Sequence, residues 1–255
     1  MTNKSSSPII GVLPDFNRGG ENKYSKMDFY AIRKNYLDSI NKYGGAPILL
    51  TYNYQAIDDY INLLDGLMIV GGDMDISPSR YGENTIHPTV KLNLERENFE
   101  CEIVKKVLAT KLPILAICNG MQLVSILHGG NIIQHIPDNP QFINHEQSHH
   151  PDFKLYSKPY HEVTIDKKSK FYSITKLEKI SVNSSHHQAV KDVGKGIVAV
   201  GKAADGIVEA IEKVDHPFCI GVQWHPEHKS SDSDELLFEE FVKQSIIFKA
   251  NKKNI

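Results

Sequence analysis

Short apolar runs alternate with helical segments through the first half of the chain, and this order limits its folds more than any other feature. The apolar runs have the length of buried strands, and glycine or proline stands at several of their ends. Helices that connect successive strands make those strands parallel, so the sequence predicts an α/β fold with a mostly parallel sheet. The predicted strands are residues 8–13, 47–51, 66–70 and 113–117, and the predicted helices are residues 29–43, 55–64, 95–110 and 121–128.

The second half of the chain is richer in strands. The clearest of them are residues 197–200, 208–211 and 218–224. Two segments, 73–94 and 139–160, have no regular pattern. The first is long enough to cover a pocket, although a solvated surface loop explains its polar residues equally well. The 255 residues suit one domain over residues 8–245, with polar termini at 1–7 and 246–255.

Charge and cysteine content exclude several classes of function. The formal net charge is -2, which gives no electrostatic basis for binding nucleic acid or an anionic membrane. No run approaches the roughly 20 apolar residues of a membrane span, and residues 1–7 lack the apolar core of a signal peptide. Three widely spaced cysteines without a Cys-x-x-Cys motif indicate a reducing compartment. We therefore expect a cytoplasmic protein that acts on small metabolites.

Cys118 lies where a predicted strand turns into a predicted helix. Residues 114–117 are apolar, and Gly120 permits a tight turn before the helix. A thiol at such a turn faces the unpaired N–H groups of the helix N-terminus, which favour the thiolate. Cys118 is therefore a candidate nucleophile, and a small buried apolar side chain is the alternative interpretation.

His225 follows another predicted strand, and Glu227 lies two residues further on. Functional groups of open α/β sheets gather at the carboxyl ends of the strands, so Cys118 and His225 are expected at one sheet edge. Glu227 can accept a hydrogen bond from one ring nitrogen of His225, which leaves the other nitrogen to receive the thiol proton. The sequence thus predicts a Cys-His-Glu triad, whereas a lone histidine in an exposed loop would carry no such role.

Backbone donors for a tetrahedral intermediate are expected beside this nucleophile. The strand at residues 66–70 is followed by Gly71 and Gly72, and glycine lets the backbone approach a ligand closely. We expect the N–H groups of Gly72 and Asn119 to form an oxyanion hole, in which the loss of one donor costs about 3 kcal/mol of transition-state stabilisation. A Gly-Gly pair by itself is also a common turn.

Four motifs, in this order, resemble those of class I glutamine amidotransferases of the peptidase C26 branch, and within it the γ-glutamyl-γ-aminobutyrate hydrolases. The resemblance covers nearly the whole chain and implies a three-layer αβα, flavodoxin-like fold with antiparallel strands added to the sheet. It also implies Cys118 as nucleophile, His225 as base and then acid, and Glu227 as the group that orients the imidazole. The motifs are Cys118-Asn119-Gly120-Met121-Gln122, Val182-Asn183-Ser184-Ser185-His186-His187-Gln188, Asp205-Gly206-Ile207-Val208-Glu209-Ala210 and Gly221-Val222-Gln223-Trp224-His225-Pro226-Glu227.

The resemblance further implies a γ-glutamyl pocket and shows three departures near it. Ala116 replaces a usual glycine, Asn119 a common arginine, and Glu97 the aspartate of an Arg-Asp pair. Because Asn119 keeps its backbone donor, its change bears on which amine is accepted rather than on hydrolysis. The side chains expected to border the pocket are Gln122, Asn183, Ser184, Ser185, His186 and His187.

Several histidines raise the question of a metal site. Adjacent residues on a strand point to opposite faces, so His186 and His187 are poor partners for one ion. A flexible polar loop provides neither fixed ligands nor the hydrogen bonds that orient them, so we expect a solvated or pocket-rim loop, no metal and no organic cofactor. The loop histidines in question are His145, His149, His150 and His161.

Together these inferences predict a cysteine-dependent hydrolase that cleaves the γ-glutamyl amide bond of a small molecule such as γ-glutamyl-γ-aminobutyrate through a glutamyl thioester. One alternative is a glutaminase subunit that delivers ammonia to a synthetase, which would be a separate protein because 255 residues leave no room for it. Another is a redox-sensing protein on the same fold, in which Cys118 is oxidised. The resemblance allows a homodimer, for which the sequence has no signature.

Overall fold

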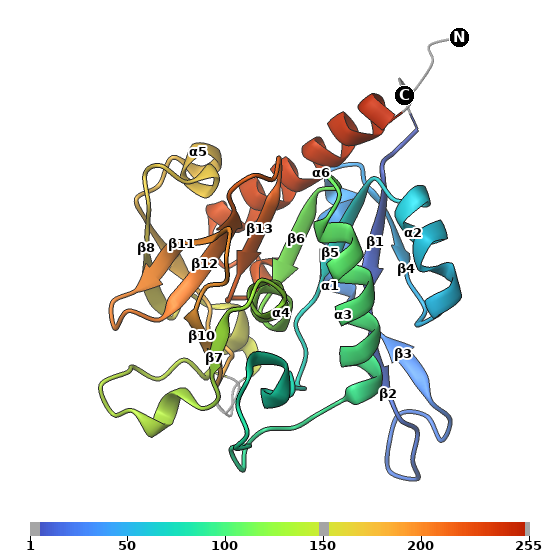
Figure 1. Ribbon diagram of the computed structural model, residues 1–255. Coiled ribbons are helices and arrows are strands. Elements are labelled where there is room, and N and C mark those ends of the chain that lie inside the picture. Colours follow the sequence, from blue (N-terminus) through green and yellow to red (C-terminus); the bar gives the residue numbers. More distant parts are fainter. Residues whose placement is uncertain (1–5, 148–152, 253–255) are drawn as a thin grey trace.

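The computed structural model describes residues 6–147 and 153–252, and it is built around one large sheet (Figure 1). The first part of this sheet is parallel, with the strands in the order β4-β1-β5-β6-β13. The carboxyl ends of β5, β6 and β13 therefore meet at one edge. The strands are β1 (Ile9–Leu13), β4 (Ala46–Leu49), β5 (Gly66–Ile69), β6 (Ile114–Ile117) and β13 (Cys219–Val222).

Antiparallel strands extend the sheet beyond β13. Their order is β12-β11-β8-β9, and β10 pairs with both β12 and β7. The segment 139–160, predicted to be irregular, lies between β7 and β8. The strands are β7 (Asn131–Ile133), β8 (His161–Ile165), β9 (Lys179–Val182), β10 (Ala189–Asp192), β11 (Ile197–Ala203) and β12 (Val208–Lys213).

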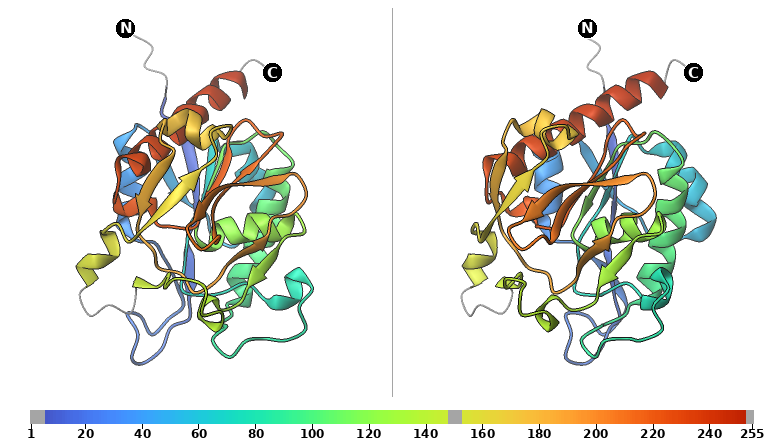
Figure 2. Two further views of the ribbon diagram at one scale, coloured as in Figure 1. Left: turned by 90° about the vertical axis from the view of Figure 1, so that its left-hand side faces the viewer. Right: turned by 60° about the vertical axis from the view of Figure 1, so that its left-hand side comes forward.

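Helices cover both faces of the sheet, which gives three layers (Figure 2). Strand residues alternate between the two cores: Leu67 and Ile69 of β5 pack in one, and Met68 packs in the other. The mostly parallel, flavodoxin-like αβα prediction is confirmed. The first core is covered by α2 (Ile57–Leu63), α3 (Leu94–Leu108) and α4 (Asn119–Leu127), and the second by α1 (Lys34–Lys42), α5 (Lys170–Thr175) and α6 (Asp232–Lys252).

The predicted helix over residues 29–43 is wrong in its first part. Residues Phe29–Ala31 form strand β3, which pairs with β2 (Asp15–Asn17) in a separate two-stranded sheet, and α1 begins only at Lys34. The ring of Tyr30 packs against Phe16 with 5.7 Å between the ring centroids. Aromatic pairing across this hairpin therefore outweighs the helical pattern.

Helix α6 was not predicted, because the second half of the chain was interpreted as strand-rich and residues 246–255 as a polar terminus. Residues 246–252 are instead the last turns of α6, and Lys249 Nζ lies 3.3 Å from Asp65 Oδ2. The sequence did contain the signal, because buried residues recur every three or four positions along α6. They include Leu237, Phe238, Phe241, Val242 and Ser245.

Short 3-10 turns complete the described chain. Segment 73–94 is irregular as predicted, apart from one such turn and an isolated bridge between Asp75 and Leu92. None of the described helices combines the length and apolarity needed to cross a membrane. The 3-10 turns are η1 (Tyr54–Ala56), η2 (Pro78–Tyr81), η3 (Ile136–Asp138), η5 (Phe153–Ser157) and η6 (Pro226–His228).

Candidate active site

Cys118 occupies a strained turn between β6 and α4, so the predicted strand-Cys-helix arrangement is confirmed. Its φ and ψ are 52° and -111°, a backbone conformation that costs a non-glycine residue about 1–3 kcal/mol. The neighbouring strand holds this turn in place, because the Cys118 N–H donates to the Val222 carbonyl at 2.7 Å. The side chain lies at the N-terminus of α4, where helix N–H groups have no partner within the helix.

Gly120 lets α4 approach the sheet closely enough to form this turn. A Cβ at position 120 would lie 2.6 Å from the carbonyl oxygen of Ile69 in β5. That contact involves backbone atoms, which cannot rotate away as a side chain would. Glycine is therefore required here for the close packing of α4 on β5, and this packing fixes the position of the Cys118 thiol.

His225 and Glu227 follow β13 and are bonded to each other. His225 Nδ1 lies 2.8 Å from Glu227 Oε1, and the turn η6 between them brings the two side chains together. The Tyr36 hydroxyl of α1 lies 3.2 Å from the same ring nitrogen. Because Nδ1 faces a carboxylate, it carries a proton, and Nε2 is left for the thiol.

Cys118 and His225 meet at the α-carbon of Gly71. A Cβ at position 71 would lie 2.8 Å from His225 Cε1 and 3.1 Å from Cys118 Cβ. Burial lowers the pKa of His225, but the Glu227 carboxylate and the Cys118 sulfur together raise it further, to about 10. The imidazole is therefore protonated at neutral pH, next to a sulfur that can accept its hydrogen bond.

The two predicted oxyanion donors lie on either side of this pair of side chains. Asn119 is the first residue of α4, and its side chain is turned away to donate to the Met74 carbonyl at 3.0 Å. Gly72 follows Gly71, and its α-carbon faces Arg96 rather than Cys118. Arg96 Nη2 donates to the carbonyls of Val70 at 3.0 Å and Gly71 at 3.3 Å, so it fixes the backbone before Gly72.

The residues expected to border a pocket are mostly tied into the structure. Asn183 holds His225 by two backbone hydrogen bonds, accepting from its N–H at 2.9 Å and donating to its carbonyl at 2.7 Å. Gln122 Nε2 donates to Gln223 Oε1 at 3.1 Å, and Gln223 Nε2 lies 3.5 Å from the Cys118 sulfur. Gln122 is thus one side chain away from the nucleophile, whereas Asn183 acts on the imidazole.

The remaining residues of that segment point in different directions. Ser184 is fully buried and donates to the His145 carbonyl at 2.7 Å, and Ser185 bridges to Glu146. His186 faces Glu209 of β12, whereas His187 Nε2 lies 3.0 Å from Asp75 Oδ1. The two adjacent histidines therefore serve separate surroundings, and a role in substrate binding for each of these residues stays a prediction.

Comparison with known proteins agrees with this geometry. The family model described as peptidase C26 matches residues 8–227. The chain belongs to the peptidase C26 family. It is therefore a glutamine amidotransferase-like enzyme of the hydrolase type, as the sequence motifs predicted.

Relatives and a solved structure extend the comparison. A Rickettsia prowazekii protein named as glutamine amidotransferase-like, RP404, is 38% identical over 93% of this chain and 98% of the relative. The Escherichia coli K12 γ-glutamyl-γ-aminobutyrate hydrolase PuuD is 29% identical over 95% of each chain. A Thermoplasma acidophilum crystal structure, whose protein is described as part of a GMP synthase, shares the fold with a TM-score of 0.63 at 16% identity, covering 97% of this chain and 98% of that one.

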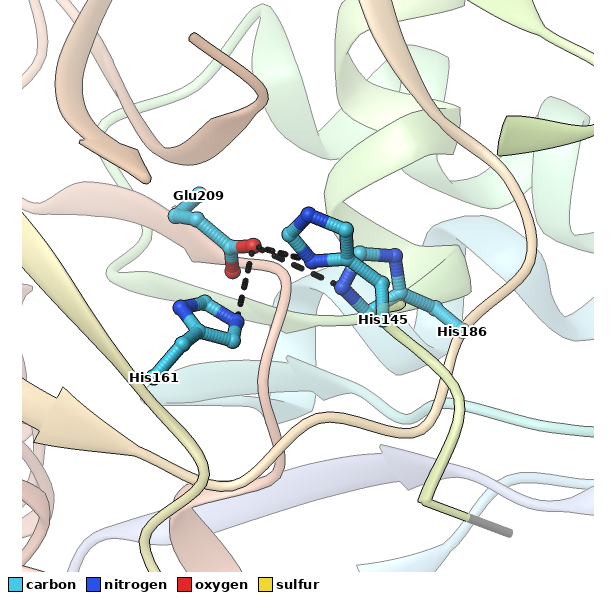
Figure 3. A group of neighbouring side chains, drawn as sticks. All are labelled: His145, His161, His186 and Glu209. Atoms are coloured by element: carbon cyan, nitrogen blue, oxygen red, sulfur yellow. Dashed lines mark ion pairs between the residues drawn. The ribbon is translucent and has the colours of Figure 1, made fainter. Parts of the chain in front are cut away.

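The interpretation of the loop histidines was wrong for His145 and His161. Their side chains are buried and surround the carboxylate of Glu209 together with His186 (Figure 3). His145 is held in place by Asp205, whose carboxylate lies 3.0 Å from His145 Nε2. Sequence spacing cannot show that an irregular segment is anchored in this way. His149 and His150 lie outside the described residues.

Sequence reasoning missed other residues of this C26 site. Tyr36 looked like a core residue of an amphipathic helix, and Arg96 was noted only as part of a motif. Gln223 had a usable signal, because it lies two residues before His225 on the strand leading to it. Glu209 was part of a quoted motif but received no role, since its partners come from three distant segments.

Proposed function

We propose that this protein hydrolyses the γ-glutamyl amide bond of a small molecule through a glutamyl thioester on Cys118. A γ-glutamyl-γ-aminobutyrate-like amide is the first substrate to consider, because PuuD and other relatives carry that activity in their names. The observation that carries the proposal is the meeting of Cys118 and the Glu227-bonded imidazole of His225 at Gly71.

The reaction follows from where the proton lies. His225 holds a proton at neutral pH, so the Cys118 sulfur can attack the amide carbonyl as a thiolate. The carbonyl oxygen becomes negative, and the backbone N–H groups of Asn119 and Gly72 are the donors expected to stabilise it. Collapse of this intermediate breaks the C–N bond, and His225 gives its proton to the departing amine.

The second half of the reaction uses the same imidazole in its neutral form. His225 takes a proton from water, the hydroxide adds to the thioester carbonyl, and the C–S bond breaks. The proton returns to His225 as the thiolate leaves, which restores the starting state and releases glutamate. Glu227 stabilises each protonated state of the ring.

The proposal is tested by amine release from a panel of γ-glutamyl amides that includes glutamine and γ-glutamyl-γ-aminobutyrate. Cys118→Ala should lower kcat by roughly 10⁴-fold or more, because removing a nucleophile disables the whole triad. Cys101→Ala is the matched control: burial raises the pKa of that thiol to about 11, and its activity should remain. Turnover by Cys118→Ala would refute the nucleophile, and ammonia release from glutamine that needs a second protein would favour a glutaminase subunit.

A further inference from the structure

Four buried side chains from four separate segments converge on one point of the molecule (Figure 3). Glu209 lies on β12 and is fully buried, and His161 begins β8. His145 lies in the segment before β8, and His186 lies between β9 and β10. One nitrogen of each ring and one oxygen of Glu209 lie within 4.8 Å of one another. None of these side chains takes part in a proton transfer or bond change of the proposed hydrolysis.

The distances in this cluster differ from those of hydrogen bonds. Glu209 Oε1 lies 3.2 Å from His145 Nδ1, 3.4 Å from His161 Nε2 and 3.5 Å from His186 Nε2. Good N–H···O bonds are about 2.9 Å long. Four ligands about 2.0 Å from a tetrahedral Zn²⁺ are separated from one another by about 3.3 Å. The observed separations match the edges of such a coordination shell.

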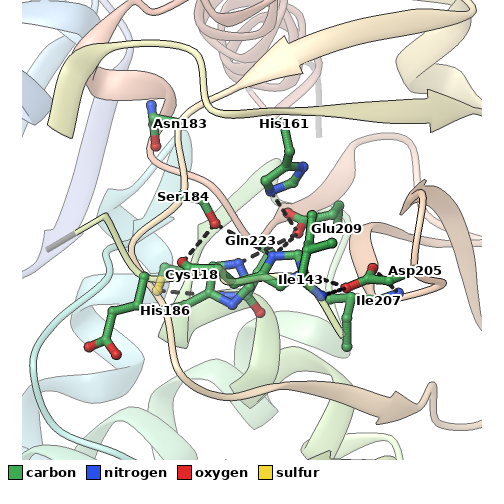
Figure 4. A network of polar contacts seen from close by, with 12 residues as sticks. Cys118, Ile143, His161, Asn183, Ser184, His186, Asp205, Ile207, Glu209 and Gln223 are labelled. Atoms are coloured by element: carbon green, nitrogen blue, oxygen red, sulfur yellow. Dashed lines mark hydrogen bonds and ion pairs between the residues drawn. The ribbon is translucent and has the colours of Figure 1, made fainter. Parts of the chain in front are cut away.

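Each histidine is oriented by a hydrogen bond on the side away from Glu209 (Figure 4). His186 Nδ1 lies 2.9 Å from the Gln188 carbonyl, and His161 Nδ1 lies 3.3 Å from the Glu162 carbonyl. A carbonyl oxygen only accepts, so these ring nitrogens carry the proton and the opposite nitrogens present a lone pair. His145 Nε2 lies 3.0 Å from Asp205 Oδ2 and leaves Nδ1 facing Glu209 in the same way. Histidine metal ligands are oriented by this kind of bond.

The inward-facing atoms lack any other partner. Nε2 of His161, Nε2 of His186 and both carboxylate oxygens of Glu209 are buried without a hydrogen bond. His145 Nδ1 has only a 3.5 Å contact with the Ser184 hydroxyl, whose proton goes to the His145 carbonyl at 2.7 Å. Buried lone pairs that face one another need a positive charge between them. A second proton on His145 would satisfy that ring alone and leave the other two nitrogens unpaired.

We propose that His145, His161, His186 and Glu209 bind one divalent transition metal ion, with Zn²⁺ as the expected occupant. Imidazole and carboxylate ligands suit zinc, and four protein ligands close its coordination shell, which is typical of a structural site. The ion would tie the segment before β8 and the β9–β10 connection to β12. Gln223 N donates to the Glu209 carbonyl at 2.8 Å, and the Gln223 side chain reaches Cys118, so the ion would support the strand beside the nucleophile.

Metal analysis of the full-length protein tests this site. Protein saturated with Zn²⁺ and then desalted should retain one equivalent, and Co²⁺ in its place should give the intense visible absorption of a tetrahedral complex. Glu209→Gln and His161→Gln should each weaken Zn²⁺ binding by roughly 100-fold or more. Asp205→Asn, which only loosens the orientation of His145, should weaken it roughly 10- to 100-fold. His87→Gln, at a histidine outside the cluster, should keep one equivalent.

Two further variants separate this site from the catalytic thiol and from a folding defect. Cys118→Ala should still bind one Zn²⁺, because the ion does not need the nucleophile. Glu209→Gln removes a buried charge at constant shape, so the variant should fold, and Zn²⁺ should no longer raise its melting temperature. Failure of the wild-type chain to retain Zn²⁺ would overturn the proposal, as would loss of the ion in Cys118→Ala or its full retention in Glu209→Gln.

Discussion

At the residue scale, the properties of His225 are set by the groups packed around it. Glu227 and Cys118 raise its pKa, whereas burial opposes this, and the Tyr36 hydroxyl and the ring of His228 also lie close by. Because the pKa rises from an ordinary value near 6.5, the ion pair stabilises the fold fully below that pH. This stabilisation is lost as the pH rises through about 10. The protonated ring is thus the resting state across the neutral range.

Glu227→Gln should lower the pKa of His225, because it removes the largest cause that raises it. The high-pH decline of kcat/KM, set by loss of the His225 proton, should then move from about 10 toward neutral pH. A pH profile of γ-glutamyl amide hydrolysis and an NMR titration of the ring measure the shift independently. Glu235→Gln, at an exposed pair with Lys42, should leave both unchanged. A His225 titration that does not move in Glu227→Gln would contradict this account.

At the element scale, the site depends on how closely α4 approaches β5. Gly120→Ala would place a Cβ against the Ile69 backbone, so the helix must shift and carry Asn119 and Cys118 with it. Such overpacking should cost about 1–3 kcal/mol of unfolding free energy. It should also slow alkylation of Cys118 by iodoacetamide, because the thiol moves relative to the helix N-terminus and His225.

Denaturant unfolding and the alkylation rate measure the two effects separately. Gly20→Ala is the control, since a Cβ there would meet only the Lys23 side chain at 3.6 Å or more. An alkylation rate equal to that of the wild type, in a variant that is destabilised, would show that the position of the thiol does not depend on this contact.

The same scale explains what the sequence could predict. Cys118, His225 and Glu227 were found because each stands at or just after a strand end, which parallel topology brings to one edge. The surroundings of Glu209 were not found, because strand periodicity gives the face of a residue but not which loops cover that face. His145 needed its contact with Asp205 to be recognised as buried. The start of α1 was misplaced because the pairing of β3 with β2 is a tertiary effect.

At the scale of the whole molecule, α6 ties the end of the chain to its beginning. It crosses the face that also holds α1 and α5, and Trp224, next to His225, donates from Nε1 to Asp234 in its first turn at 2.8 Å. Its far end reaches the other side of the sheet edge, where Lys249 Nζ donates to the Ser7 carbonyl at 2.6 Å. The helix therefore links the candidate active site to the N-terminal strand.

Removing residues 246–255 should destabilise the protein, although the sequence suggested a dispensable polar tail. The truncation deletes Phe248, which packs against the first core, and the Lys249 contacts with Ser7 and Asp65. Loss of this partly buried ring should cost about 1–3 kcal/mol, which corresponds to a fall in melting temperature of several degrees for a chain of this size. Removing only residues 253–255 should leave the melting temperature unchanged. Because Asp234 and the first turns of α6 remain in both truncated chains, alkylation of Cys118 should proceed at the wild-type rate below the transition, and equal melting temperatures for the two would show that the last turns of α6 contribute nothing to the fold.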